Sequence, residues 1–189
     1  MSFYTRDELL SFGFKSLGNE VKISKKASIY NAANIEIGDF SRIDDFCVLS
    51  AGEGGISIGR YVHIAIYCSL IGSGRIELHD FSGLSSRVVI YSSNDDYSGN
   101  YMTNPTVPSE YTNVSSAPVT VGRHGIVGAG SIVLPGVVLQ EGAGVGALSL
   151  VKQDCEEFSM YFGVPAKRIG RRRKGMLDCE KHLIAEERD

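Results

Sequence analysis

The sequence has no tryptophan, only five prolines among 189 residues and a net charge of only −3 at pH 7. It lacks the excess of lysine and arginine that neutralises a phosphate backbone, so nucleic acid is not an expected partner. No stretch approaches the roughly 18 apolar residues of a membrane span, and the N-terminal MSFYTRDELLSFGF lacks the apolar run of a signal peptide. We therefore predict a cytoplasmic protein with no membrane partner.

The four cysteines, Cys47, Cys68, Cys155 and Cys179, show no CxxC spacing. In a reducing compartment they are predicted to act as small hydrophobic residues, neither bridged nor bound to zinc. Glycine is abundant, at 22 residues, while hydrophobic residues make up 43% of the chain. This composition argues against disorder and predicts one folded domain with many turns.

The second half of the chain repeats every six residues. From Val121 it reads VGRHGI, VGAGSI, VLPGVV, LQEGAG, VGALSL, VKQDCE. Each step begins with an aliphatic residue, and its fifth position holds nothing larger than valine. A six-residue step accommodates a very short strand and a turn, so that three steps close a triangular coil with both of these positions pointing inward.

The same frame extends back through the first half of the chain. Its aliphatic positions there are Ile23, Ile29, Ile37, Ile43, Leu49, Ile58, Ile64, Leu70, Leu78, Leu84 and Ile90. The step exceeds six only after every third position, at one recurring corner, and the long gap between Ile90 and Val121 falls at that corner. We therefore predict a long loop over residues 91–118. A chance alignment of aliphatic residues in a β-sandwich is the alternative, and the constant register disfavours it.

These repeats, followed by YFGVPAKRI, resemble the hexapeptide-repeat acyltransferases, and the layout is closest to the galactoside and xenobiotic acetyltransferase group. The resemblance covers about residues 21–170. It implies an all-β fold, a left-handed parallel β-helix, in a domain spanning residues 1–170. It also implies a homotrimer, acetyl-CoA or a related acyl-CoA as the donor, and active sites at the subunit interfaces.

Short helices are predicted at both ends. Residues 5–11 carry Thr5 as an N-cap and Glu8 three positions on, with an apolar face of Leu9, Leu10 and Phe12. The basic tail, residues 171–189, has apolar residues at helical spacing and is predicted to form a helix beside the last coil.

The residue before each aliphatic position points outward, because neighbours in a strand alternate faces. On the second face this column is Arg42, His63, Gly83, Ile126 and Gly144. The resemblance implies that this face contributes to the acyl-CoA groove, with Ile126 where relatives often carry tryptophan. Small residues cluster in the last coils: Gly128, Ala129, Gly144, Gly146 and Ala147. They would let the pantetheine arm of the donor approach the backbone, and the alternative is that they serve only tight turns.

Positive charge is concentrated near the C-terminus, in Lys152, Lys167, Arg168 and residues 171–174. Cations there would bind the phosphates of coenzyme A by charge-assisted hydrogen bonds. Lys167 also matches a family position near the adenosine. For residues 171–174 the alternative is an ordinary solvated surface.

Acyl transfer needs a base that removes a proton from the attacking amine or hydroxyl. The galactoside and xenobiotic enzymes use a histidine at the start of the long loop, and this sequence has Asp95 there. The predicted catalytic residues are His63, on the groove face, and Asp95 and Asp96 on the loop. A surface histidine and purely structural Asx turns are the alternatives. His79 and His124 are predicted to be ordinary surface residues.

The resemblance and the missing loop histidine favour N-acetylation of a nucleotide-linked amino sugar, such as a dTDP-4-amino-4,6-dideoxy sugar, for surface polysaccharide synthesis. A neutral amine needs less help from a base than a hydroxyl does. Sugar O-acetylation is the alternative within enzymes, and a β-helical scaffold is the non-enzymatic one. No metal is expected, because His63, His79 and His124 fall at unlike positions of the repeat and do not match the γ-type carbonic anhydrases.

Overall fold

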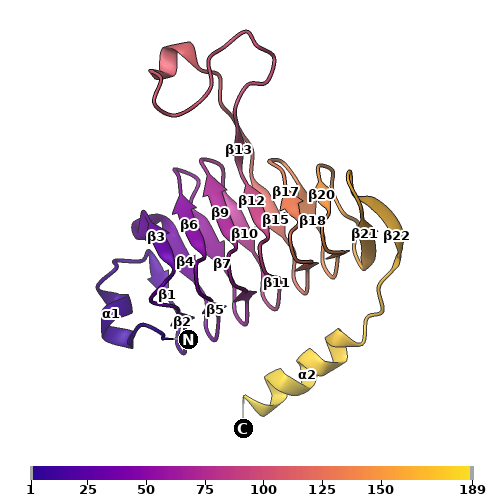
Figure 1. The fold of residues 1–189 in the computed structure, drawn as a ribbon. Coiled ribbons are helices and arrows are strands. Elements are labelled where there is room, and N and C mark those ends of the chain that lie inside the picture. The colour runs from indigo at the N-terminus through magenta and orange to yellow at the C-terminus, as the bar shows by residue number, and fades with distance from the viewer. Residues whose placement is uncertain (1, 188–189) are drawn as a thin grey trace.

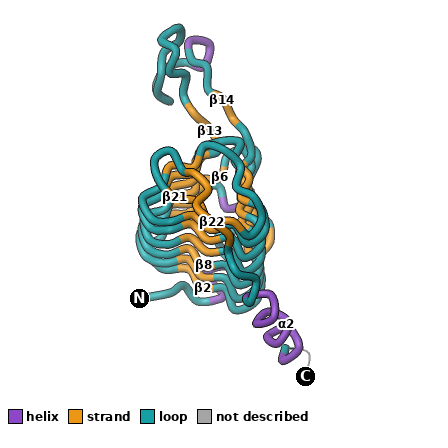
Figure 2. Tube along the Cα trace, turned by 90° about the vertical axis from the view of Figure 1, so that its right-hand side faces the viewer, coloured by secondary structure: helices purple, strands orange, loops and turns teal. Residues whose placement is uncertain are grey.

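The computed structural model describes residues 2–187 as a three-sided parallel β-helix with a projecting loop and two short helices (Figures 1 and 2). The first sheet contains β1 (Ser16–Leu17), β4 (Ile35–Ile37), β7 (Ile56–Ile58), β10 (Ile76–Leu78), β15 (Val119–Val121) and β18 (Val138–Leu139). The second contains β2 (Lys22–Ile23), β5 (Arg42–Ile43), β8 (His63–Ile64), β11 (Gly83–Leu84), β16 (Ile126–Val127), β19 (Gly144–Val145), β21 (Ser159–Phe162) and β22 (Lys167–Arg171). The third contains β3 (Ser28–Tyr30), β6 (Val48–Ala51), β9 (Ser69–Gly72), β12 (Val89–Tyr91), β17 (Ile132–Val133) and β20 (Leu150–Val151).

The six-residue period produces this coil because it places aliphatic side chains in register on the inside. On the second face, Leu84 pairs with Ile64 on one side and with Val127 on the other. Every predicted inward aliphatic residue is buried except Ile29, which is half-buried, and the small residues at the fifth positions are buried as well. Full burial of each such side chain stabilises the fold by about 1.5–3 kcal/mol. The predicted repeat is confirmed.

Aromatic residues stack along the corner between the first and second faces. Phe40, Tyr61, Phe81 and His124 all have φ between 56° and 59°. Successive ring centroids lie 4.8, 5.2 and 5.2 Å apart. A left-handed conformation costs a residue other than glycine roughly 1–2 kcal/mol, and each stacked pair contributes about 0.5–1.5 kcal/mol. Stacking therefore offsets much of the strain at this corner.

The predicted loop leaves the coil after β12 and returns at β15. Its base is an antiparallel ribbon of β13 (Ser93–Asn94) and β14 (Ser115–Ser116), and its outer part contains a 3₁₀ turn, η2 (Ser109–Tyr111). A second 3₁₀ turn, η1 (Ala32–Asn34), lies within the coil. The loop stands away from the body of the coil (Figure 1).

The first helix, α1 (Arg6–Leu10), begins with the predicted capping box: Thr5 Oγ1 accepts from the Glu8 amide, and Glu8 accepts from the Thr5 amide. Leu9 is buried, but Leu10 is 57% exposed. The prediction that Leu10 belongs to the apolar face is therefore wrong, because a helix of five residues presents only one position to the coil.

The second helix, α2 (Met176–Glu186), does not stay beside the last coil as predicted. It runs back along the aromatic corner, where Glu180 pairs with Arg123 and His124. Glu187, just beyond the helix, pairs with Arg60 two levels further down the corner. These ion pairs fix the direction of α2. Residues 188 and 189 of the predicted tail lie outside the described residues.

Cys47, Cys68 and Cys155 are buried free thiols, as predicted, and burial raises the pKa of Cys155 to about 12. Cys179 is exposed on α2, against the prediction. None of the helices among residues 2–187 has both the length and the apolar character needed to cross a membrane.

Candidate active site

The outward column of the second face has the predicted order, but its last member, Gly144, is buried against the prediction, because Met160 and Arg172 pack over it. Strand pairing places Arg42 beside His63, His63 beside Gly83, Gly83 beside Ile126 and Ile126 beside Gly144. A pocket of about 280 Å³ opens on this column; its lining residues are His63, Ala65, Gly83, Leu84, Ser85, Ser86 and Ile126. The pocket thus combines an imidazole, two hydroxyl groups and an apolar wall.

His63 is held by a buried carboxylate. Its Nε2 lies 2.9 Å from Oδ2 of Asp44, whose side chain is only 7% exposed, whereas the His63 side chain is 53% exposed. Arg42 donates from Nε to the other oxygen of Asp44, at 2.6 Å. Arg42 and Asp44 share one side of the chain because they are two residues apart in an extended segment. When Nε2 donates to Asp44, Nδ1 of His63 is left as the acceptor.

Asp44, Ser85 and Ser86 are site residues that the sequence reasoning missed. Ser85 and Asp44 occupy the position after the inward aliphatic residue of the second face, where the last two coils have Gly128 and Gly146. Polar residues at that position, next to a histidine in the outward column, were the available signal.

The loop carboxylates behave differently from each other. Asp95 lines a separate pocket of about 510 Å³ between the loop and the third face, together with Tyr91. Asp96 accepts from the Ser98 amide at 2.6 Å and from Nδ2 of Asn113 at 2.8 Å. Interactions with the Ser98 side chain first, then with Asn113 and the Ser98 amide, hold the pKa of Asp96 below its ordinary value. Asp96 therefore organises the loop, as an Asx turn does.

Within one chain, His63 and Asp95 do not meet. They line different pockets, and the loop that carries Asp95 projects away from the coil (Figure 2). A site that uses both residues has to be completed by a second copy.

His124 is buried, against the prediction of a surface position. Its ring stacks on Phe81, and its Nε2 lies 2.7 Å from Glu180 Oε2. Burial first, and then the nearby Arg123 and Arg172, lowers the pKa of His124, while Glu141 opposes the shift. A neutral His124 donates Nε2–H to Glu180. His79 is exposed, with a 53% exposed side chain, as predicted.

The predicted small residues of the groove have packing reasons of their own. A Cβ at Gly128 would lie 2.5 Å from the Ala147 amide nitrogen, and one at Gly146 would lie 2.5 Å from the ring of Phe162. Ala129 and Ala147 are exposed beside them. Close packing against the next coil, and not a tight turn, therefore accounts for both glycines, and a surface against which a linear ligand can lie remains.

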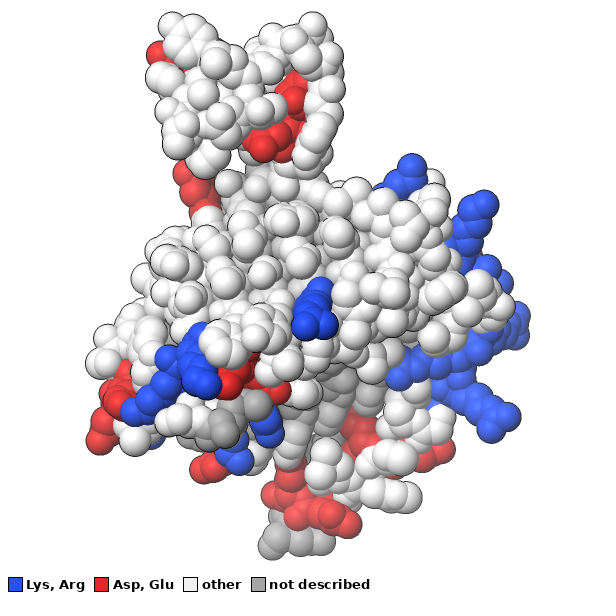
Figure 3. Space-filling view, in the orientation of Figure 1, with Lys and Arg blue, Asp and Glu red and all other residues white. Residues whose placement is uncertain are grey.

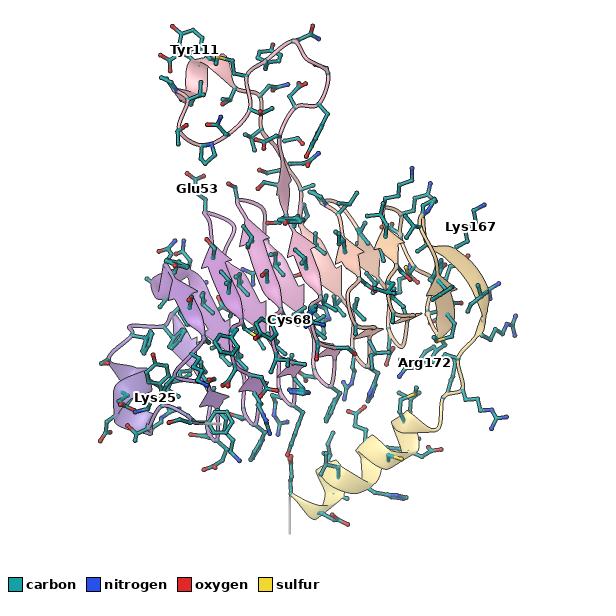
Figure 4. The ribbon with its side chains drawn as sticks, viewed as in Figure 1. Lys25, Glu53, Cys68, Tyr111, Lys167 and Arg172 are labelled. Carbon is teal, nitrogen blue, oxygen red and sulfur yellow. The ribbon has the colours of Figure 1, made fainter. Side chains whose placement is uncertain are left out.

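Basic side chains gather at the end of the coil formed by β21 and β22 (Figure 3). Lys152 and Lys167 are exposed, and Lys167 points away from the coil (Figure 4). Arg168 donates to Ser159 Oγ at 3.0 Å and pairs with Glu156 at 3.3 Å. Arg172 instead donates to the carbonyl groups of His124 and Gly142, so it anchors the tail to the coil.

No three His, Cys, Asp or Glu side chains of residues 2–187 are grouped in a way that would hold a metal ion. A β-helix of hexapeptide repeats, with a small-residue groove between a cationic end and an imidazole, defines the class of hexapeptide-repeat acyltransferases, which take an acyl group from acyl-CoA.

No protein-family model matches the chain. The chain is 58% identical over 180 residues to the dTDP-4-amino-4,6-dideoxy-D-glucose acyltransferase of Escherichia coli, covering 95% of this chain and 94% of that protein. It belongs to the family of that enzyme. It is also 30% identical over 158 residues to the putative lipopolysaccharide biosynthesis O-acetyl transferase WbbJ of E. coli K12, covering 78% of this chain and 74% of WbbJ.

Solved structures agree with this assignment. AntD, an N-acyltransferase from Bacillus cereus, superimposes with a TM-score of 0.93 at 43% identity in its complex with dTDP and 3-hydroxybutyryl-CoA, covering 100% of this chain and 99% of AntD. A variant of AntD has been solved with dTDP-4-amino-4,6-dideoxyglucose and coenzyme A; it also has a TM-score of 0.93, at 44% identity and 98% coverage of both chains.

Proposed function

We propose that this enzyme transfers an acyl group from acyl-CoA to the 4-amino group of dTDP-4-amino-4,6-dideoxyglucose. The observation that carries the proposal is 58% identity, over nearly the whole of both chains, to an acyltransferase named for that sugar. The complexes of AntD with the same nucleotide sugar, and with an acyl-CoA, support it. The reaction would take place in the cytoplasm, and its product would enter surface polysaccharide synthesis.

In the proposed reaction the sugar amine attacks the thioester carbonyl, an amide bond forms, the carbon–sulfur bond breaks, and coenzyme A leaves with a proton. His63 is the proposed base, accepting the amine proton at Nδ1 while Asp44 holds Nε2. The hydroxyl groups of Ser85 and Ser86 line the same pocket, where a donor can stabilise the oxyanion.

Coenzyme A is proposed to lie along the second face. Lys167, Lys152 and Arg168 would bind its phosphates, and the arm would follow Gly146, Ala147, Gly128 and Ala129 toward Ile126. Arg168 is already engaged by Glu156 and Ser159. Among the described residues neither Lys167 nor Lys152 has an ion-pair partner, and we assign the 3′-phosphate to Lys167 because it matches the family position near the adenosine.

We further propose that the active unit is a homotrimer, in which the loop of one copy brings Asp95, and beside it Asp96, to the His63 pocket of the next. Two features support this. The loop projects from its own coil, and the third face carries a column of outward apolar side chains, Val89, Ile132 and Leu150. Ile132 is 37% exposed, and apolar area of this kind is typical of interfaces.

The assay for the function incubates the purified protein with acetyl-CoA or 3-hydroxybutyryl-CoA and the dTDP-amino sugar, and follows product mass. An amide, stable to hydroxylamine, is expected. A hydroxylamine-labile ester on a sugar hydroxyl would instead support O-acylation, the activity suggested by the name of WbbJ.

Light scattering tests the assembly and should give about three times the chain mass of 20.5 kDa. Ile132→Arg should dissociate the trimer and abolish activity, while the matched Thr120→Arg, on the outward side of the first face, should do neither. A fully active monomer would contradict the proposal of an interfacial site.

A further inference from the structure

Most glycines within the coil are required by close packing. A Cβ at Gly38 would lie 2.6 Å from the backbone of Gly59, and one at Gly59 would lie 2.4 Å from Asp80. Gly83 is different. The nearest atom that a Cβ there would meet is the carbonyl oxygen of His63, 4.0 Å away, and its φ lies outside the left-handed region. Neither the packing nor the backbone conformation requires glycine at this position.

The missing side chain leaves a gap in an otherwise continuous column. Gly83 lies in register between His63 and Ile126, both of which project outward. Neighbouring parallel strands are about 4.8 Å apart, so the gap lies directly between the imidazole and the isoleucine side chain. It is part of the pocket of about 280 Å³ that opens on this face.

The walls of this gap suit a short acyl chain. Ile126, which is 40% exposed, and Ala65 provide apolar contacts, while the hydroxyl groups of Ser85 and Ser86 provide hydrogen bonds. The order along the coil also fits. A donor that enters from the cationic end along the exposed Ala147 and Ala129 passes Ile126 before it reaches Gly83, and His63 comes next. The acyl group, at the far end of the donor, therefore arrives at Gly83.

We propose that the gap at Gly83 is the acyl-chain subsite, and that Gly83 makes it large enough for acyl groups longer than acetyl. This inference rests on the proposed function, because it places the thioester next to His63. The predicted substrate class is acyl-CoA with a chain of up to about four carbons, including chains with a hydroxyl group that Ser85 or Ser86 can bind.

The test compares Gly83→Ala and Gly83→Val with the wild-type enzyme, using acetyl-CoA, butyryl-CoA and 3-hydroxybutyryl-CoA as donors and the dTDP-amino sugar as acceptor. The measured quantity is the ratio of kcat/KM for a four-carbon donor to kcat/KM for acetyl-CoA. One methylene group in a filled pocket is worth about 10- to 200-fold in discrimination. Gly83→Val should therefore lower the ratio at least ~10-fold, and Gly83→Ala should lower it less.

Two further variants sharpen the result. Ile126→Ala enlarges the gap from its other side, so it should raise kcat/KM for hexanoyl-CoA relative to acetyl-CoA. Gly175→Ala is the matched control, because a Cβ there also meets nothing within 4 Å but lies at the start of α2. It should leave the donor ratio unchanged.

An equal loss with all three donors, accompanied by a higher KM for the sugar, would assign the gap to the acceptor and overturn the inference while the proposed function stands. An unchanged donor ratio in Gly83→Val would overturn it as well. If the wild-type enzyme transfers no acyl group to the dTDP-amino sugar, the proposed function itself fails.

Discussion

Nε2 of His63 lies 2.9 Å from Oδ2 of Asp44, so that an exposed imidazole is oriented by a carboxylate that is almost fully buried. The Arg42 guanidinium binds the other oxygen of Asp44 and balances its charge. When Nε2 donates its proton to Asp44, the second ring nitrogen of His63 is left as a proton acceptor. This arrangement resembles the orientation of a catalytic histidine by an aspartate in other acyl-transfer sites.

Removal of the base should reduce turnover. His63→Ala should lower kcat by ~10²- to 10⁴-fold, the usual contribution of a general base. Steady-state kinetics at saturating donor and acceptor measures this effect, and light scattering verifies assembly. Wild-type kcat in a correctly assembled variant would mean that the amine enters already neutral and needs no base from the protein.

Asp44 is expected to act only through His63. In the Asp44→Asn variant the new side-chain amide can offer an N–H to Nε2 of the histidine, which moves the ring proton to Nδ1 and removes the acceptor. We expect kcat to fall at least ~10-fold with little change in either KM. The informative measurement is a double-mutant cycle. In the His63→Ala background, Asp44→Asn should have no further effect on kcat; an additive loss would indicate a separate structural role.

Asp95 is predicted to hold the acceptor sugar or its ammonium group. Asp95→Asn should therefore raise KM for the dTDP-amino sugar, with a smaller effect on kcat. The matched Asp96→Asn variant removes a carboxylate that binds Ser98 and Asn113 inside the loop. It should lower the thermal stability of the loop, and it should change KM for the sugar less than Asp95→Asn does. If Asp95→Asn instead lowers kcat by a larger factor than it raises KM for the sugar, Asp95 would be the base.

The fold could be predicted from the sequence because its physical cause is local and repeated. Every third hexad returns to the same face, so Ile64, Leu84 and Val127 have to stack if each is to be buried. The projecting loop was predictable for the same reason, since it interrupts the period. The path of α2 was not, because it depends on Glu180 meeting Arg123 from a distant part of the chain.

The site was predictable in part. Alternation along a strand identified the outward column and with it His63 and Gly83. It did not identify Asp44 as the partner of His63, because that contact joins two different coils. The open space at Gly83 is equally invisible in the sequence, where Gly83 looks like the glycines that packing requires.

Donor affinity should depend on Lys167. Lys167→Ala should raise KM for acyl-CoA roughly 10-fold with little change in kcat, because a hydrogen bond to a charged group contributes about 1.5–3 kcal/mol. Lys22→Ala, at the opposite end of the coil, is the control. The comparison with dephospho-CoA donors locates the contact. If Lys167→Ala weakens both donors equally, Lys167 does not bind the 3′-phosphate.

The attachment of α2 should depend on pH through His124. Its pKa is lowered from the ordinary value of 6.5, first by burial and then by Arg123 and Arg172, although Glu141 opposes the shift. The unfolded chain therefore binds a proton that the native protein does not take up. The contribution of His124 to the free energy of unfolding is fully present above about pH 6.5. It declines as the pH falls below that value and levels off below the lowered pKa of the native state.

The variant His124→Gln separates this effect from other titrations. Glutamine keeps an N–H donor for Glu180 but does not titrate, so the variant should lose less stability than the wild type between pH 7 and pH 5. Chemical denaturation at a series of pH values measures the difference in free energy of unfolding. A wild type that becomes more stable than the variant as the pH falls would mean that protonated His124 forms a net favourable ion pair with Glu180. In that case the attraction of Glu180 would outweigh burial and the two arginines.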